Sequence, residues 1–259
     1  MELIPIIPTT LLALFAVGLI AGTIDAIAGG GGLLTLPALL ATGIPPIQAI
    51  ATAKLQSSAG TCSAALCYLR HGEFELRPLL LALPCTLLGS LAGAGSLSYI
   101  DPQLIASLLP LLFVLVGGYF LFSPQVGDLD RQQRISTTSF AVLVGGGIGF
   151  YDGFLGPGTG TFLAVGFIVL LGYNLRRATA AAKILNLTSN LAALALFIHG
   201  EQIIWSYGLV MAAGQILGGS IGARLALRGG SRLIRPLVVS VCLIMVGKIW
   251  GPELLRVMQ

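Results

Sequence analysis

The sequence predicts an all-α, polytopic membrane protein built from two similar halves. Hydrophobic residues make up 56% of the 259 positions and charged residues only 9%, a balance that fits neither a soluble domain nor a disordered chain. Several apolar runs reach the roughly 20 residues with which a helix crosses a bilayer. A glycine-rich interruption, with an aspartate before it and a lysine after it, occurs twice. Such self-similarity indicates an internal duplication.

Each half carries one aspartate and one lysine inside apolar sequence, Asp25 with Lys54 and Asp152 with Lys183. The aspartates are 127 residues apart and the lysines 129, so a two-residue insertion aligns the two copies. An ionisable residue in a membrane segment costs roughly 2.5–3.5 kcal/mol on insertion scales, and such residues usually mark functional sites. The four residues are therefore the first candidates for a site.

Glycines interrupt the helix at 29–32 in the first half and at 156–160 in the second. The apolar pieces that follow, 33–42 and 161–171, are too short to cross a bilayer as helices. Non-helical backbone at membrane depth is tolerated only where protein buries it or where it lines a watery cavity. Both breaks are thus expected to lie at a cavity.

Long apolar spans complete each half. The first is read as a retained helix and not as a signal peptide, because nothing basic precedes it and Asp25 lies inside it. The spans are residues 9–28, 47–69, 76–97, 103–122, 174–198, 203–227 and 231–250. The predicted domains are a first membrane repeat (1–125), a cytoplasmic linker (126–136) and a second membrane repeat (137–259).

Arginines predict the orientation, because cytoplasmic loops carry the excess of Lys and Arg. The connections around 44–46, 98–102 and 200–202 contain none. This places the two halves in opposite orientations, with five segments each and both termini outside; Lys248 and Arg256 disagree mildly. The arginines assigned to the cytoplasm are Arg70, Arg77, Arg131, Arg134, Arg176, Arg177, Arg224, Arg228, Arg232 and Arg235.

The two lysines fall roughly 12–15 Å into their helices, near the middle of a core of about 30 Å. One polar stripe at helical spacing accompanies each lysine. The stripes are Lys54, Ser57, Ser58 and Thr61 in one helix, and Thr179, Lys183, Asn186 and Asn190 in the other. Inverted repeats with broken helices are typical of transporters whose site lies where the repeats meet.

The chemistry of these groups suits a compact anion. Two ammonium groups, amide and hydroxyl donors, and backbone N–H groups freed by the glycines would surround it, with the positive ends of the half-helices pointing inward. The candidate substrate-binding residues are Lys54, Lys183, Ser57, Asn186, Asn190, Gly30, Gly31, Gly158 and Thr159. Structural pairing of Lys54 with Asp25 and of Lys183 with Asp152 explains the same residues, and proton coupling explains the aspartates equally well.

Other kinds of site find little support in the residues. The cysteines (Cys62, Cys67, Cys85 and Cys242) and the two histidines form no metal-ligand spacing, and no nucleotide-binding loop follows the glycines. The scattered arginines make no nucleic-acid patch. We expect no cofactor, no metal and no catalytic residue; the expected partners are a small anion and the lipid bilayer, and homo-oligomerisation stays open.

The segments DAIAGGGGLLTLPAL and ATAKLQS in the first half, and GFYDGFLGPGTGTF and ATAAAKILNLTSN in the second, resemble the TauE/SafE sulfite-exporter family, in particular its YfcA-like branch. The resemblance covers nearly the whole chain. It implies a transporter of sulfur-containing anions, such as sulfite or organosulfonates, in the bacterial inner membrane.

Two alternative functions belong to other classes. A passive anion channel would use the same inverted repeat around basic residues. An intramembrane aspartyl protease would need two membrane aspartates, and Tyr151-Asp152 is similar to part of one such motif, but the Gly-x-Gly-Asp partner motif is missing.

Overall fold

The computed structural model describes residues 8–72, 79–101, 103–105, 108–109, 111 and 132–229, and every regular element in these ranges is helical. This confirms the all-α prediction. The elements are α1 (Pro8–Ala28), α2 (Gly32–Leu40), α3 (Pro46–Arg70), α4 (Ala82–Ser96), the 3₁₀ turn η2 (Leu97–Tyr99), α6 (Thr137–Phe140), the π-helical segment η3 (Ala141–Gly146), α7 (Gly147–Phe154), α8 (Thr159–Leu171), α9 (Leu175–His199) and α10 (Trp205–Gly229).

Among the described helices, α1, α9 and α10 are long and apolar enough to cross a membrane, and α4 and α8 are shorter apolar helices. The predicted spans 9–28, 47–69, 174–198 and 203–227 match α1, α3, α9 and α10 to within a few residues. The span 76–97 corresponds to α4, although its first residues lie outside the described ranges. The span 231–250, most of 103–122 and most of the linker also lie outside them.

Both predicted glycine breaks are present. Gly29, with φ of 81°, separates α1 from α2, while Gly156 and Gly158, with φ of 93° and 83°, separate α7 from α8. These left-handed conformations favour glycine, because a Cβ atom would be strained there. The two breaks also touch, since a Cβ on Gly29 would run into the backbone of Gly160. The helix interruptions therefore meet at one place in the fold.

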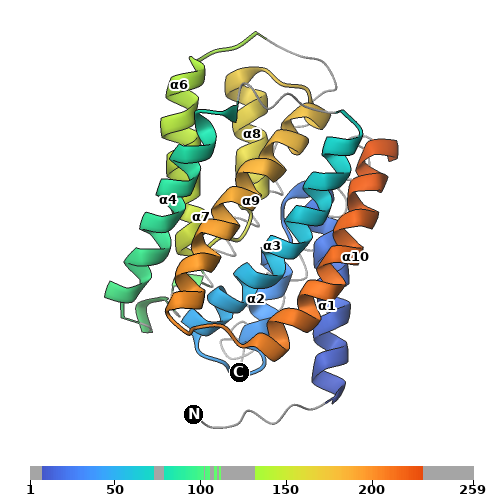
Figure 1. Cartoon of the computed structure of the whole chain (residues 1–259), viewed down its shortest axis with the longest axis vertical. Coiled ribbons are helices and arrows are strands. Elements are labelled where there is room, and N and C mark those ends of the chain that lie inside the picture. Colours follow the sequence, from blue (N-terminus) through green and yellow to red (C-terminus); the bar gives the residue numbers. More distant parts are fainter. Residues whose placement is uncertain are drawn as a thin grey trace, which may run out of the picture.

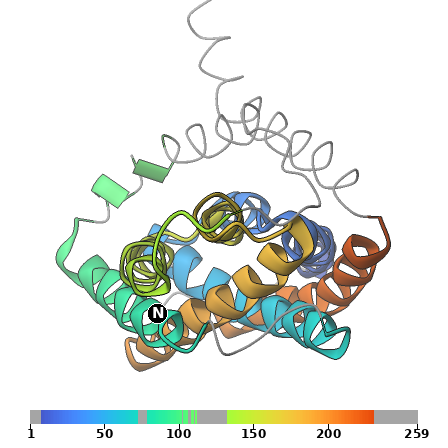
Figure 2. The same cartoon turned by 90° about the horizontal axis from the view of Figure 1, so that it is seen from above.

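The helices pack reciprocally across the two halves (Figure 1). Helix α1 packs on α10, and α7 packs on α4; α3 packs on α10, and α9 packs on α4. Seen from above, α1 and α10 lie at one side of the bundle and α6, α7 and α4 at the other (Figure 2). The duplication aligns α3 with α9, and these two helices contact each other while running in opposite directions in Figure 1. Each of these contacts between the two halves thus has a counterpart in which the halves are exchanged.

Glycines let the paired helices approach closely, as in many membrane proteins. A Cβ on Gly89 or Gly93 of α4 would collide with the backbone of the helix containing Gly146 and Phe150, and one on Gly218 or Gly222 of α10 with the backbone of α1. From the sequence we predict close helix packing at Gly43, Gly89, Gly93, Gly218 and Gly222, and these contacts confirm it for the last four.

Gly43 was interpreted in the same way, and for this residue the interpretation is wrong. It lies in the turn after α2 with φ of 85°, and a Cβ atom there would meet no atom within 4 Å. Backbone conformation, not helix packing, explains the glycine at this position.

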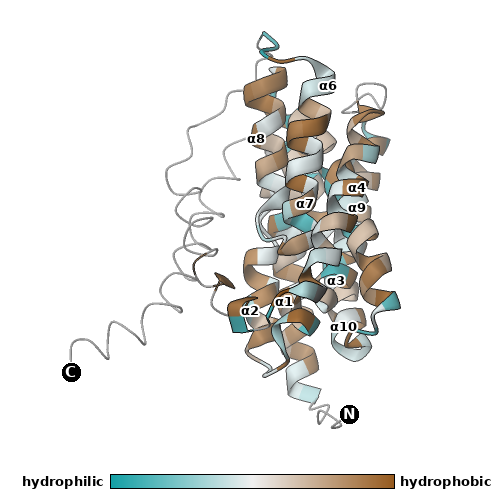
Figure 3. Ribbon diagram, turned by 90° about the vertical axis from the view of Figure 1, so that its left-hand side faces the viewer, coloured by the Kyte–Doolittle hydropathy of each residue, from teal (hydrophilic) through white to brown (hydrophobic). Residues whose placement is uncertain are grey.

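The outer faces of the bundle are apolar (Figure 3). Leu88 on α4 and Leu143 on η3 are 64% and 70% exposed, and Leu209 and Leu217 on α10 are also exposed. Polar residues, by contrast, gather inside: the buried set includes Lys54, Asp152, Lys183, Asn186 and Asn190. An apolar exterior around a polar centre is the pattern of a helical membrane protein, because lipid solvates the outside.

Candidate functional site

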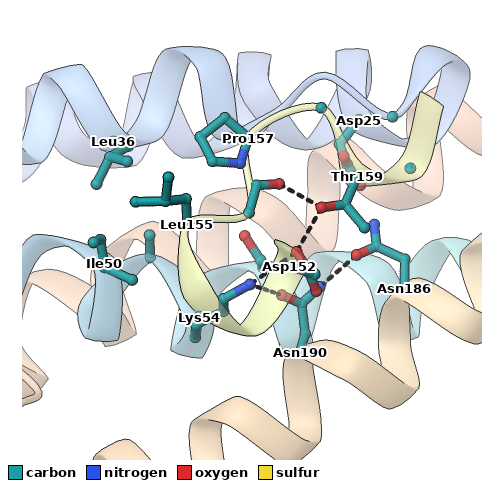
Figure 4. A pocket seen from close by; sticks show the side chains of 17 residues that line it. Asp25, Leu36, Ile50, Lys54, Asp152, Leu155, Pro157, Thr159, Asn186 and Asn190 are labelled. Atoms are coloured by element: carbon teal, nitrogen blue, oxygen red, sulfur yellow. Dashed lines mark hydrogen bonds and ion pairs between the residues drawn. The ribbon is translucent and has the colours of Figure 1, made fainter. Parts of the chain in front are cut away.

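A small cavity of about 30 Å³ lies where the two glycine breaks meet (Figure 4). Its lining comes from both halves and comprises Asp25, Gly29, Gly32, Leu36, Ile50, Ala53, Lys54, Ser57, Asp152, Leu155, Gly156, Pro157, Gly158, Thr159, Gly160, Asn186 and Asn190. A water needs about 10–15 Å³ of such space, so the cavity holds only a few waters at most. The cavity is therefore small, and the polar side chains around it bond mostly to one another.

Lys54, in the middle of α3, forms an ion pair with Asp152, near the end of α7. Its Nζ lies 2.9 Å from Asp152 Oδ1 and also donates a hydrogen bond to Asn190 Oδ1 at 3.2 Å. Both charged side chains are almost fully buried. A buried charge is stable only when it is paired and hydrogen-bonded, and both conditions are met here.

Lys183, in α9, forms the second ion pair with Asp25, three residues before the end of α1. Its Nζ lies 2.7 Å from Asp25 Oδ2. The other carboxylate oxygen accepts a longer hydrogen bond, 3.3 Å, from the backbone N–H of Gly31 in the glycine break. Lys183 is itself fully buried and does not line the cavity, whereas Asp25 does.

The two ion pairs cross between the halves, so the hypothesis that Lys54 pairs with Asp25 and Lys183 with Asp152 is wrong. The reason is the packing of the breaks against each other: it presents the end of α1 to the second half and the end of α7 to the first. Spacing along the chain carries no information about this exchange.

The two carboxylates have different surroundings. Asp152 Oδ1 accepts a hydrogen bond from Thr159 Oγ1 at 2.7 Å, and Asp152 Oδ2 accepts one from Ser189 Oγ at 2.5 Å, in addition to the lysine. Among the described residues, only Lys183 and the backbone N–H of Gly31 bond to the Asp25 carboxylate. Its side chain is 15% exposed, against 2% for Asp152. The second-half carboxylate is therefore the more firmly held.

The amide side chains extend the polar centre along the α3–α9 contact. Asn190 Nδ2 donates to Asn186 Oδ1 at 3.0 Å, and it lies 3.4 Å from Thr61 Oγ1. Ser57 also lines the cavity, as the helical stripe predicted. Thr179, the first residue of the second stripe, instead donates to the backbone oxygen of Leu175 one turn earlier.

The glycines at the site differ in part from those predicted. Gly158 and Thr159 line the cavity as expected, but Gly30 and Gly31 do not, and Gly29 and Gly32 do so instead. The first residues of the half-helices α2 and α8 thus face the cavity, and helix N-termini favour negative charge.

Several residues of the site gave no signal in the sequence. Leu36, Ile50, Leu155 and Pro157 form an apolar wall on one side of the cavity in Figure 4. Apolar residues cannot be distinguished in a chain that is mostly apolar, so only the tertiary structure identifies them. Ser189 lies three residues after Asn186, a helical spacing that could have added it to the stripe.

The part of the chain that the structure describes holds no group of three or more His, Cys, Asp or Glu side chains arranged to bind a metal ion. Within the same ranges, Cys62, Cys67 and Cys85 are free thiols. Cys242 lies outside the described residues.

Comparison with known proteins identifies the family. The model of the family described as "Sulfite exporter TauE/SafE" matches residues 14–249. A probable membrane transporter protein of Haemophilus influenzae is 49% identical over 235 residues, which cover 91% of this chain and 92% of the relative. The probable membrane transporter protein YfcA of Escherichia coli K12 is 46% identical over 242 residues, covering 93% and 90%. No solved structure matches the chain.

Both relatives are named as probable membrane transporters. The family match spans most of the sequence, including both glycine breaks and both ion pairs, and the resemblance noted in the sequence is confirmed. The chain belongs to the TauE/SafE sulfite-exporter family and is a membrane transporter of that family.

Proposed function

We propose that this transporter binds a small anion, a sulfur oxyanion or an organosulfonate, in the central cavity and carries it by alternating access. The observation that carries the proposal is the position of Lys54 and Lys183. Lys54 lines the cavity where the two broken helices meet, and the buried Lys183 of the other half is paired with Asp25, which also lines it. Helix N-termini at the same place favour negative charge.

The reciprocal packing supports an inverted repeat. Corresponding helices exchange partners between the halves, and α3 and α9 run in opposite directions in Figure 1. Two such halves can rock against each other around a fixed central site. The small volume of the cavity favours a binding site of such a cycle over the wide pore of a channel.

The positions of the arginines support a proposed orientation in the bacterial inner membrane. Helix α3 ends at Arg70, α9 begins beside Arg176 and Arg177, and α10 carries Arg228 in its last turn. These helix ends lie at one end of the bundle in Figure 1, which we assign to the cytoplasm. If the sequence-predicted span 231–250 crosses the membrane once more, both chain termini are periplasmic.

A thermal-shift screen of the purified protein tests the proposed substrate class. The panel contains sulfite, sulfate, thiosulfate, sulfoacetate and taurine, with acetate as a carboxylate control. A ligand at a hundred times its Kd stabilises the folded state by about 2.7 kcal/mol, so true ligands should raise the unfolding temperature clearly. Stabilisation by acetate alone, or by none of these anions, would contradict the proposal.

Counterflow in proteoliposomes distinguishes a transporter from an anion channel. A transporter loaded with an unlabelled hit from the screen should concentrate the labelled anion transiently, whereas a channel should only let it equilibrate. The geometry gives no support to an aspartyl protease, because each carboxylate is paired with a lysine.

A further inference from the structure

We infer that the carboxylate of Asp25 is a built-in occupant of the anion site: it holds Lys183 when no substrate is bound, yields that lysine to the incoming anion, and takes up a proton as it does so. This inference rests on the proposed function and specifies how the anion reaches an ammonium group that is already paired. In the same scheme Asp152 and Lys54 form a fixed pair that positions the site.

The first step of the reasoning is that an anion cannot bind to this site without displacing a carboxylate. Each of the two buried ammonium groups is already within 3 Å of an aspartate, at 2.7 and 2.9 Å, so the two pairs carry no net charge. An anion in the cavity would meet no unneutralised cation, and its negative charge would lie beside two carboxylates. One pair must therefore open during transport.

The second step is that the Asp152 pair is built to stay closed. If the Asp152 carboxylate moved away from Lys54, it would also lose the hydrogen bonds from Thr159 and Ser189. The carboxylate would then be buried without hydrogen-bond donors, which is costly. Lys54 is held in turn by Asn190.

The third step is that the Asp25 pair lacks these supports. Aligning the two repeats on their aspartates places Gly32 opposite Thr159, and aligning them on their lysines places Gly60 opposite Ser189. Both hydroxyl donors are thus replaced by glycine on this side. Asp25 keeps one lysine and one backbone N–H at 3.3 Å, and its side chain borders the cavity.

The fourth step concerns the charge that Asp25 would carry after release. An anion at Lys183 would lie beside this carboxylate, and two adjacent negative charges in a water-poor site are mutually unfavourable. Proton uptake from solution removes the conflict: a paired Asp25 and Lys183, one anion and one proton become a neutral Asp25 carboxyl group and an anion paired with Lys183.

The charged groups around Asp25 permit this exchange. Lys183 faces it from α9, and the cavity brings Lys54 from α3 and Asp152 from α7, which already neutralise each other. The cavity lining from α2 and α8 contains no titratable side chain, and the described arginines of α10, Arg224 and Arg228, are exposed at its end. Lys183 is thus the cation for which Asp25 and the anion compete.

The test compares Asp25→Asn with the matched change Asp152→Asn in the full chain, using sulfite and sulfoacetate as probes. Calorimetric titration in buffers of different ionisation enthalpy gives both the affinity and the protons taken up. The wild type should take up close to one proton per anion. Asp25→Asn should bind the probe more tightly, about tenfold if Lys183 is free in only a tenth of wild-type molecules, and should take up none.

Three results support the inference together: tighter binding by Asp25→Asn, no such gain in Asp152→Asn, and loss of the gain when Lys183→Met is added to Asp25→Asn. Binding by Asp25→Asn that is equal to or weaker than that of the wild type would overturn it, as would unchanged proton uptake. Asp25→Ser serves as a second variant, and failure of both Asp25 variants to fold would show that Asp25 is structural, contrary to the inference.

A readout without ligand separates this inference from the proposed function. The unfolding temperature should fall less in Asp25→Asn than in Asp152→Asn. Both changes leave a buried lysine without its carboxylate, but only the second also disturbs the hydrogen bonds from Thr159 and Ser189. The reverse order would refute the inference whatever the substrate is. If neither probe binds the wild type or Asp25→Asn while the expected order of unfolding temperatures holds, the proposed substrate class fails and the labile Asp25 pair stands.

Discussion

The partners of each charged residue decide how the protein responds to its removal. Lys54 and Asp152 are both buried, so removing one charge leaves the other without compensation. Breaking such a pair typically costs about 3–5 kcal/mol, whereas replacing both partners by neutral groups of similar volume is often tolerated. The structure therefore predicts that a change at Asp152 compensates for the loss of Lys54, whereas the spacing along the chain suggested Asp25.

Lys54→Met alone should yield much less folded protein, and adding Asp152→Asn should restore most of it. Adding Asp25→Asn to Lys54→Met should not help, because Asp25 is paired with Lys183. Gel filtration and thermal unfolding of the detergent-solubilised variants measure the recovery. Equal rescue by the two aspartate changes would mean that the crossed pairing is incorrect.

At this scale the sequence identified the right residue types but not their connections. Lys54, Lys183 and the two asparagines were predictable because polar residues in apolar helices need a reason to be there. The pairing was not predictable, since it depends on which break packs against which helix. Gly29 and Gly32, and not the predicted Gly30 and Gly31, line the cavity for a similar reason. Four consecutive glycines look alike until the backbone shows which one is left-handed.

The helix breaks combine an unusual backbone with a close neighbour, and the two effects can be separated. A Cβ on Gly156 would lie 2.7 Å from Lys54 Nζ, and one on Gly29 would collide with the backbone of Thr161. Gly43 has a similar φ, 85°, but open space around it. It is the matched control for backbone strain alone.

Gly29→Ala and Gly156→Ala should both abolish anion flux in proteoliposomes. Gly43→Ala should keep flux, with a stability loss of roughly 1–2 kcal/mol from the left-handed backbone. If Gly43→Ala lost flux to the same extent, strain rather than crowding at the site would be responsible.

Helix α4 offers a second matched pair. A Cβ on Gly93 would collide with the backbone oxygen of Phe150 in α7, while one on Gly95 would meet nothing within 4 Å. We expect Gly93→Ala to destabilise the protein by about 1–3 kcal/mol through overpacking. Gly95→Ala should be neutral or slightly stabilising, because alanine favours helix over glycine. Thermal unfolding compares the two, and equal effects would argue against a close α4–α7 contact.

Element boundaries were largely predictable because apolar length and glycine breaks are local signals. The π-helical segment η3 was not anticipated. It precedes α7 in the second half, whereas its counterpart α1 is continuous in the first. A one-residue change in hydrogen-bond register leaves no reliable mark on composition.

At the scale of the molecule, the duplication predicted which helices correspond, and the structure shows how they associate. The two halves do not form two separate bundles. Each half packs its helices on helices of the other half, so that α1 lies on α10 and α7 on α4. Both ion pairs depend on this exchange. The sequence alone could not distinguish this packing from two independently packed halves, because the spacing of residues along the chain is the same in both arrangements.

The exchange also fixes which loops share a side of the membrane. In Figure 1 the end of α3, the start of α6, the start of α9 and the end of α10 lie at one end of the bundle, whereas the turn after α2 and the end of α9 lie at the other. Six described arginines belong to the first group, namely Arg70, Arg134, Arg176, Arg177, Arg224 and Arg228. Arginine bias supports our proposal that this end faces the cytoplasm.

Reporter fusions test this assignment. Fusions after Gln132 and after Gly229 should report cytoplasm, and fusions after Gly43 and after Gly200 should report periplasm; a fusion at the C-terminus, which lies outside the described residues, should also report periplasm. The decisive comparison is Gly200 with His71, because they follow the corresponding helices α9 and α3. If both report the same side, the two halves are not inverted, and rocking around a shared site no longer explains transport.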